Sequence, residues 1–249
     1  MSEVTESQQP TKDSIRSLKC FKVLSFDVVG TLIDFERGML HYLRRSVPES
    51  KVTDEAFLEA YRHARTSEAA GPYPDDLVRA WSDVAKAVGL PDTPALAEGF
   101  RDSVAEWPAF ADSAEALWRL RRRFKLLGMT NTRRWAVGYF ECTLGQPFDD
   151  MVTADDALCE KPDPQFFAFT RGRLSTRGFT LDDTLHVAQS QFHDIGVARR
   201  LGYTVCWIER RKGQPGFGAT KSVAQLTKPD YHFHTLAELA DAVDAAFAG

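Results

Sequence analysis

The chain has 249 residues, of which 43% are hydrophobic and 27% are charged, with a formal net charge of -4 at pH 7. This is enough apolar material for one sizeable core, or for one core with a smaller appended domain. The acidic balance argues against an electrostatic nucleic-acid binder, and no apolar run approaches the length of a membrane span. The four cysteines show no metal-binding spacing, so the sequence predicts reduced thiols in a cytoplasmic globular protein.

The chain is expected to begin with a flexible tail, because residues 1–19 are polar and lack the apolar region of a secretory signal. A near-continuous apolar run follows at residues 21–29 and is interrupted by Asp27. Gly30 and Thr31 come next. The run therefore predicts a strand that is buried on both faces of a parallel sheet and is followed by a turn.

A helical insert is predicted directly after this first strand. Helical patterns separated by Gly, Pro and Ser recur at residues 38–45, 54–68, 75–88 and 93–103. No convincing strand pattern lies among them. We therefore expect residues 37–104 to form a helical cap, appended to a core made of residues 20–36 and 105–249.

Beyond the insert, strand and helix patterns alternate. Strands are predicted at residues 125–130, 185–189, 204–208 and 231–233. Helices are predicted at residues 113–123, 133–144, 164–174, 193–201 and 236–247. This alternation indicates an α/β fold with a doubly wound parallel sheet and a Rossmann-like core.

Polar residues fall where ligands bind in such sheets, at or just past the carboxyl ends of strands. They are Asp27 with Thr31, Thr130 with Asn131, Lys161, and Asp194. Taken singly, a strand-end Asp is more often a turn cap and a lone Lys is more often on the surface. Together they predict one pocket, in which Lys161 holds Asp27 ionised as a nucleophile.

Four segments in order resemble the motifs of the haloacid dehalogenase superfamily. They read FDVVGTL at residues 26–32, MTN at 129–131, EKPDP at 160–164 and VAQSQFHD at 187–194. The resemblance covers nearly the whole chain after residue 20 and includes a helical cap inserted after the first motif. It implies the fold of that superfamily, with Asp27 as the nucleophile.

Two substitutions argue against the phosphatase branch of this superfamily. Its phosphatases carry a second Asp two residues after the nucleophile, whereas Val29 stands here and cannot transfer a proton. The first acid of their fourth motif is replaced by Gln189. The remaining carboxylates make a poor site for Mg²⁺, which prefers hard anionic oxygens. We therefore expect no metal and no cofactor.

The pattern resembles instead the type II L-2-haloacid dehalogenases, which act on (S)-2-haloacids without metal. By that resemblance, Asp27 displaces halide from the α-carbon of a small carboxylate and forms an ester. Asp194 then positions the water that hydrolyses the ester. Thr31 and Lys161 stabilise the Asp27 carboxylate.

The resemblance also implies the groups that bind the substrate. Thr130 and nearby backbone amides take the substrate carboxylate, while Asn131 and an arginine of the cap hold the departing halide. For that arginine we choose Arg62, with Arg65 as the alternative one turn away. Both lie in a segment whose apolar residues predict a helix packed over the core.

The fourth motif completes the predicted substrate- and halide-binding set with Ser190, Gln191 and His193. His193 stands where the dehalogenases have an aromatic residue, and Phe167 replaces an expected tyrosine. Because an imidazole N–H suits a small hydrated anion, His193 favours fluoride or a small oxygen or nitrogen leaving group. The alternative is that His193 packs outside the site or caps the following helix.

Other functions remain open at this point. The same attack by Asp27 could open another carbon–heteroatom bond of a small carboxylate; a Mg²⁺-dependent phosphatase and an inactive binding relative rank lower. We expect no nucleic-acid or membrane partner, and a homodimer is a candidate assembly. His232 and His234 alternate on the last predicted strand, but no third ligand is evident in the sequence, which argues against a metal site there.

Overall fold

The computed structural model describes residues 16–249. Of the tail that we expect at residues 1–19, residues 1–15 therefore lie outside the described residues. A short 3-10 helix, η1 (Leu18–Cys20), precedes the sheet, and the side chain of Leu18 is buried. Ordered structure thus begins before residue 20.

The core is a sheet of six parallel strands in the order β3-β2-β1-β4-β5-β6. The strands are β1 (Val23–Phe26), β2 (Lys125–Met129), β3 (Asp150–Val152), β4 (Thr184–Ala188), β5 (Thr204–Ile208) and β6 (Tyr231–Phe233). The chain order reverses at β1, which pairs with β2 on one side and β4 on the other. A ligand site is expected at the carboxyl ends of the strands at such a reversal.

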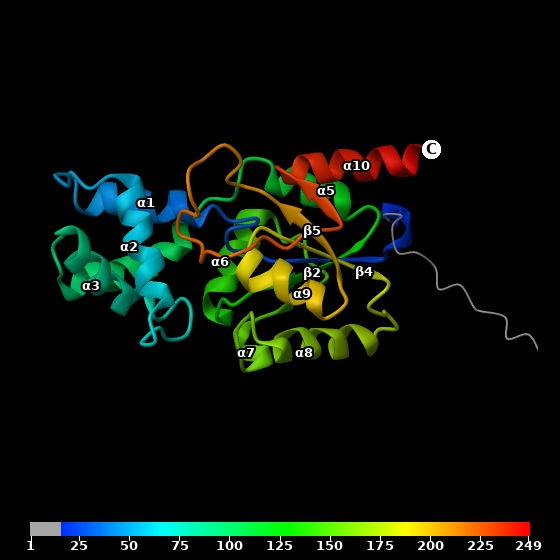
Figure 1. The fold of residues 1–249 in the computed structure, drawn as a ribbon, viewed down its shortest axis with the longest axis horizontal. Helices are drawn as coiled ribbons and strands as arrows, with labels where there is room; N and C mark the ends of the chain where they lie inside the picture. The colour runs from blue at the N-terminus through cyan, green and yellow to red at the C-terminus, as the bar shows by residue number, and fades with distance from the viewer. Residues whose placement is uncertain (1–15) are drawn as a thin grey trace, which may run out of the picture.

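Helices cover both faces of the sheet, as Figure 1 shows: α5 and α10 lie over one face, and α8 and α9 over the other. The core helices are α5 (Ser113–Leu120), α6 (Arg134–Leu144), α7 (Ala154–Ala157), α8 (Pro164–Ser175), the π-helix η3 (Gln191–Ile195), α9 (Gly196–Arg200) and α10 (Leu236–Ala248). The predicted doubly wound α/β fold is confirmed. None of the helices in residues 16–249 could span a membrane.

The remaining helices lie together beside the sheet, at one end of the molecule in Figure 1. They are α1 (Phe35–Ser46), α2 (Asp54–Thr66), α3 (Leu77–Val88), α4 (Pro94–Asp102) and the 3-10 helix η2 (Ser103–Glu106). The side chain of Thr53 caps α2 by accepting from Ala56 N, and Gly89 ends α3 in the left-handed conformation.

An aromatic cluster fills the interior of this helical group. The rings of Tyr42, Phe57 and Trp81 all pack against Phe100, at centroid distances of 5.6, 6.1 and 5.4 Å. Each such pair contributes about 0.5–1.5 kcal/mol beyond the area it buries. The helices that overhang the carboxyl ends of the strands are therefore well packed in their own right.

Candidate active site

Asp27 directly follows β1, and its residue is 7% exposed. Gly30 has a φ of 93°, a left-handed conformation that glycine adopts without strain, and it turns the chain just past the carboxylate. Thr31 then reaches back: its hydroxyl donates to Asp27 Oδ2 at 2.6 Å and accepts from Gln189 N at 2.8 Å. The turn after β1 therefore fixes one oxygen of the carboxylate.

Lys161 is the central cation of the site, and it is 2% exposed. Its Nζ donates to Asp27 Oδ1 at 2.9 Å, to Asp194 Oδ1 at 2.6 Å and to Met129 O at 2.7 Å. An ammonium has three N–H donors, so all of them are used. Although burial opposes its charge, Asp194 and Asp27 raise the pKa of Lys161. Burial raises the pKa of Asp27, while Lys161 and Thr31 oppose that shift.

Asp194 lies in the π-helix η3 beyond β4 and is fully buried. Burial acts to raise its pKa, but the charge of Lys161 and a hydrogen bond from His186 lower the pKa of Asp194 to about 2. Its Oδ1 accepts from both groups, whereas its Oδ2 has no hydrogen-bond partner among the described residues. Asp194 is therefore an anion with one free oxygen.

His186, in the middle of β4, is a site residue that our sequence reasoning missed. Its Nε2 lies 3.2 Å from Asp194 Oδ1, and its Nδ1 lies 3.0 Å from Ser25 Oγ. With the proton on Nε2, the ring donates to the carboxylate and accepts from the Ser25 hydroxyl. Phe167, where the resemblance calls for tyrosine, packs edge-on against His186 at 5.8 Å. The available signal was a polar residue in an otherwise apolar strand, which must find partners when buried.

These groups border a cavity of about 140 Å³. Eight of the ten predicted site residues line it: Asp27, Arg62, Thr130, Asn131, Lys161, Ser190, His193 and Asp194. The other two do not. Thr31 donates to Asp27 from outside the cavity lining. Gln191 Oε1 accepts from Thr227 N at 2.9 Å, and its buried Nε2 has no hydrogen-bond partner among the described residues, so its place in the substrate-binding set stays a prediction.

Both candidate arginines of α2 line the cavity, but their partners differ. Arg62 donates to Gly218 O at 2.7 Å and lies 3.2 Å from Glu59. Arg65 forms an ion pair with Asp76 and donates to Gly71 O at 3.0 Å. Asp76 is a buried carboxylate, whereas Glu59 is exposed, so Arg65 neutralises a buried charge and Arg62 does not.

His193 faces the cavity, which removes the alternative that it packs outside the site. Ser190 Oγ accepts from the backbone N–H of His193 at 2.9 Å and lies 3.1 Å from its Nδ1. The Ser190 hydrogen is then free to be donated to Nδ1, which leaves the ring proton on Nε2. Burial lowers the pKa of His193 to about 4, so the ring is neutral at pH 7 and offers an N–H donor.

The second predicted motif shapes the loops around Lys161. The Asn131 side chain donates to Lys161 O at 2.8 Å and accepts from Lys161 N at 2.7 Å. One N–H of the Asn131 amide remains for a ligand. Thr130 is buried, and its hydroxyl donates to Thr132 Oγ1 at 2.9 Å.

Tyr73 is a second lining residue that the sequence did not reveal. Its hydroxyl is buried without a hydrogen-bond partner in residues 16–249, and burial raises its pKa well above the usual value. It therefore stays a neutral O–H donor. Thr220 and Lys221, from the long loop after β5, also line the cavity. No local pattern in the sequence marks these positions.

No family model matches the chain. Among curated proteins it is similar to the (S)-2-haloacid dehalogenase of Pseudomonas putida, with 26% identity over 121 residues, which is 45% of this chain and 49% of that protein. The match therefore spans about half of that relative's length. The (S)-2-haloacid dehalogenase 4A of Burkholderia cepacia is 22% identical over 206 residues, which is 77% of this chain and 84% of that protein.

Solved structures resemble the chain over more of its length. The L-2-haloacid dehalogenase of Xanthobacter autotrophicus has a TM-score of 0.69 at 20% identity, covering 90% of this chain and 98% of that one. The defluorinating L-2-haloacid dehalogenase Rha0230 has a TM-score of 0.74 at 17% identity, covering 92% and 98%. The HAD-hydrolase YfnB of Bacillus subtilis, solved bound to magnesium, has a TM-score of 0.72 at 20% identity, covering 90% of this chain and 99% of that one. The chain thus has the haloacid dehalogenase fold, as the four motifs imply.

Proposed function

We propose that this chain is a metal-independent hydrolase that releases halide from small 2-haloacids through an ester on Asp27. The arrangement of charges in the cavity carries the proposal. A buried Asp27 carboxylate and the anionic Asp194 share the ammonium of Lys161, and Asp194 keeps one oxygen free. This arrangement suits a nucleophile with a separate base.

In the first step, a carboxylate oxygen of Asp27 attacks the α-carbon of the haloacid from the side opposite the halogen. An ester C–O bond forms as the carbon–halogen bond breaks, and halide leaves with the bonding electrons. The configuration at carbon inverts. Halide needs no proton in order to leave, so the general acid that Val29 replaces is not required.

In the second step, water attacks the carbonyl carbon of the Asp27 ester, and the free oxygen of Asp194 takes its proton. The Lys161 ammonium and the Thr31 hydroxyl already contact this carboxyl group, and they stabilise the oxyanion that forms on it. The departing alkoxide takes the proton from Asp194. A 2-hydroxy acid is released. Asp27, now with one oxygen from water, returns to its carboxylate when the second proton of that water is released to solvent.

The substrate is bound between a core and a cap, which we assign to residues 20–36 with 105–249 and to residues 37–104. Thr130 takes the substrate carboxylate by turning its hydroxyl away from Thr132, and the buried hydroxyl of Tyr73 adds a donor. Arg62, the free N–H of Asn131 and the Nε2–H of His193 surround the leaving group. The cavity of about 140 Å³ fits small acids.

The test is halide release in EDTA from L- and D-2-chloropropionate, chloroacetate and fluoroacetate, measured by ion chromatography. Wild-type protein is expected to release halide and Asp27→Asn is not, at early times before deamidation restores the carboxylate. Mg²⁺-dependent phosphate release without halide would contradict the proposal. If no halide appears from any substrate, the reaction belongs to another carbon–heteroatom bond.

A further inference from the structure

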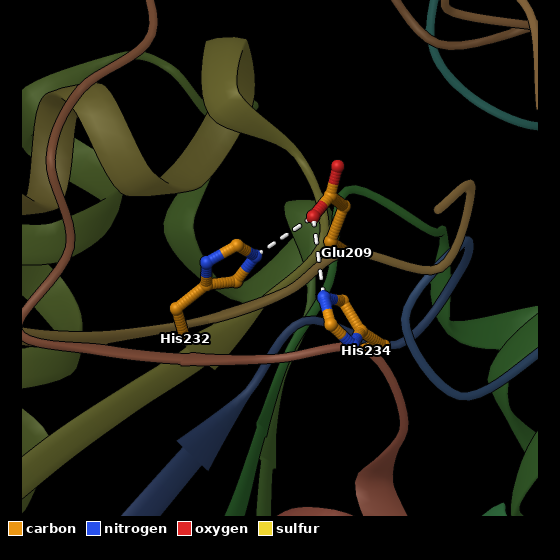
Figure 2. Close-up of side chains that lie close together, drawn as sticks. All are labelled: Glu209, His232 and His234. Atoms are coloured by element: carbon orange, nitrogen blue, oxygen red, sulfur yellow. Dashed lines mark hydrogen bonds and ion pairs between the residues drawn. The ribbon is translucent and has the colours of Figure 1, made fainter. Parts of the chain in front are cut away.

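Three potential metal ligands meet at the carboxyl ends of β5 and β6, outside the candidate active site (Figure 2). Glu209 directly follows β5, His232 lies in β6 and His234 directly follows it. Glu209 N donates to Phe233 O at 2.8 Å, which holds the two strand ends side by side. Side chains two residues apart on a strand point to the same face, so both imidazoles reach the same carboxylate.

The distances between the ligand atoms are close to those of a metal site. His232 Nε2 lies 2.9 Å and His234 Nε2 lies 3.7 Å from Glu209 Oε2, and the three ligand atoms lie within 4.8 Å of one another. Four donors placed tetrahedrally at about 2.0–2.2 Å from zinc are about 3.3–3.6 Å apart. Small side-chain rotations would therefore bring all three donors to one ion.

We propose that Glu209, His232 and His234 bind a divalent transition-metal ion, zinc foremost, with at least one position left for solvent. Two imidazoles and one carboxylate are a donor set that zinc uses in proteins. The same set accepts cobalt, nickel and copper, whereas Mg²⁺ and Ca²⁺ favour all-oxygen sites. No third ligand is evident from the sequence alone, because Glu209 lies 23 residues before His232.

The surroundings orient the ligands as a metal site requires. The His232 ring stacks on Trp207 at 4.5 Å with an interplanar angle of 19°. His234 Nδ1 lies 3.8 Å from Glu238 Oε2, which also accepts from His234 N at 2.7 Å. A carboxylate hydrogen-bonded to the far nitrogen is the usual support of a metal-bound histidine, and a small side-chain rotation would bring the His234–Glu238 pair from 3.8 Å to that distance.

An ion from solution can reach the site, since the side chains of His232, His234 and Glu209 are 40%, 43% and 25% exposed. One cation already competes for the carboxylate: Lys212 Nζ lies 3.8 Å from Glu209 Oε2. The Lys212 side chain is 59% exposed and free to turn into solvent. A bound ion would join the ends of β5 and β6 and stabilise the folded state.

The proposal is tested by titrating the metal-free full chain with Zn²⁺ in a calorimeter. One equivalent is expected to bind, and His232→Ala or His234→Ala should each weaken binding at least tenfold. The matched control is His63→Ala, because His63 also faces a glutamate, Glu59 at 3.8 Å, but belongs to no such cluster in the described chain. The control should bind like wild type. Lys212→Ala should bind more tightly.

A second readout is independent of catalysis. Zinc should raise the thermal midpoint of wild type and of His63→Ala, but not that of the His232→Ala/His234→Ala double variant. Halide release should be the same with and without zinc, because none of the three ligands lines the cavity. Equal zinc affinity in wild type and the double variant, or no detectable binding to wild type, would overturn the metal site and leave the proposed reaction untouched.

Discussion

His186 lines no part of the cavity, yet it holds the carboxylate that we assign as the base. It donates to the same Asp194 oxygen as Lys161 and lowers the pKa of that carboxyl group. The contact leaves the other Asp194 oxygen as the acceptor for water. His186 is therefore a positioning residue, and its loss should affect ester hydrolysis more than ester formation.

The prediction for His186→Ala is an ester that accumulates on Asp27. Hydrolysis should slow about tenfold, a part of the 10²–10⁴ that a positioned base contributes. Removing the donor raises the pKa of Asp194. When the pH is lowered, Asp194 should therefore become protonated, and hydrolysis should be lost, at a higher pH than in wild type. Single-turnover quenching followed by mass spectrometry measures the rate of ester hydrolysis at each pH. Because the esterified Asp27 no longer titrates, the pH dependence of this rate reports on Asp194. His186→Gln keeps an N–H donor and should recover part of the rate; an unchanged pH profile in His186→Ala would refute the role.

His193 tests which leaving group the site suits. Its neutral ring offers an N–H to the cavity, and fluoride, being small and strongly hydrated, depends most on such a donor. His193→Phe should therefore depress fluoride release from fluoroacetate at least tenfold more than chloride release from chloroacetate. The ratio of the two rates, measured by ion chromatography, is the readout. Equal losses for both halides would remove the argument for fluoride.

Among single residues, the sequence located those that carry a motif and missed those that only support it. Asp27 and Asp194 follow predicted strands, and the EKPDP motif marks Lys161, so their meeting at one edge could be predicted. Ser25 and His186 are 161 residues apart, and their contact depends on the pairing of β1 with β4. That pairing is a property of the sheet, which a single sequence does not encode locally.

At the scale of elements, β5 and β6 were predicted to the residue, because short apolar runs bounded by turn residues mark them. Strand β3 was not among the predicted strands, since it has three residues, begins with Asp150 and lies at the sheet edge. The helix predicted at residues 193–201 is in fact the π-helix η3 followed by α9. The spacing of apolar residues does not distinguish a π-helical first turn from an α-helical one.

Helix α2 carries both candidate arginines, and their different partners make them separable. Arg62→Ala should lower kcat/KM for the haloacid about tenfold, because the charge on the leaving halide develops in the transition state, and should leave the unfolding midpoint nearly unchanged. Arg65→Ala should instead destabilise the protein by about 1–3 kcal/mol, because the buried Asp76 loses one of its two arginine partners and keeps Arg79. Urea unfolding and steady-state kinetics on both variants decide the assignment. If Arg65→Ala alone lowers kcat/KM while remaining stable, the halide contact belongs to Arg65.

Helix α1 approaches the core closely at Gly38. A Cβ there would lie 2.3 Å from the Trp107 ring, so Gly38→Ala should destabilise the protein by about 1–3 kcal/mol. Gly138 in α6 is the matched control, since its Cβ would meet nothing within 4 Å. Gly138→Ala should stabilise by up to about 1 kcal/mol through helix propensity. Thermal and urea unfolding report both; a neutral Gly38→Ala would mean that Trp107 can move aside.

At the scale of the whole molecule, the cavity is assembled from the segments at the strand ends, from α1, α2 and the segment after α2, and from the loop that follows β5. The sequence anticipated the strand ends through motifs and α2 through its amphipathic pattern. It did not anticipate Thr220 and Lys221, nor that Glu209 joins His232 and His234, because loops of this length have no periodic pattern.

In the proposed reaction Asp27, and not water, attacks the substrate carbon. The direct measurement is one turnover of 2-chloropropionate in H₂¹⁸O with enzyme in excess, followed by mass spectrometry of the peptide that contains Asp27 and of the lactate. We expect ¹⁸O in Asp27 and none in the first lactate, since water enters at the ester carbonyl. Labelled lactate with an unlabelled Asp27 would mean that water attacks the substrate directly, and it would contradict the ester mechanism.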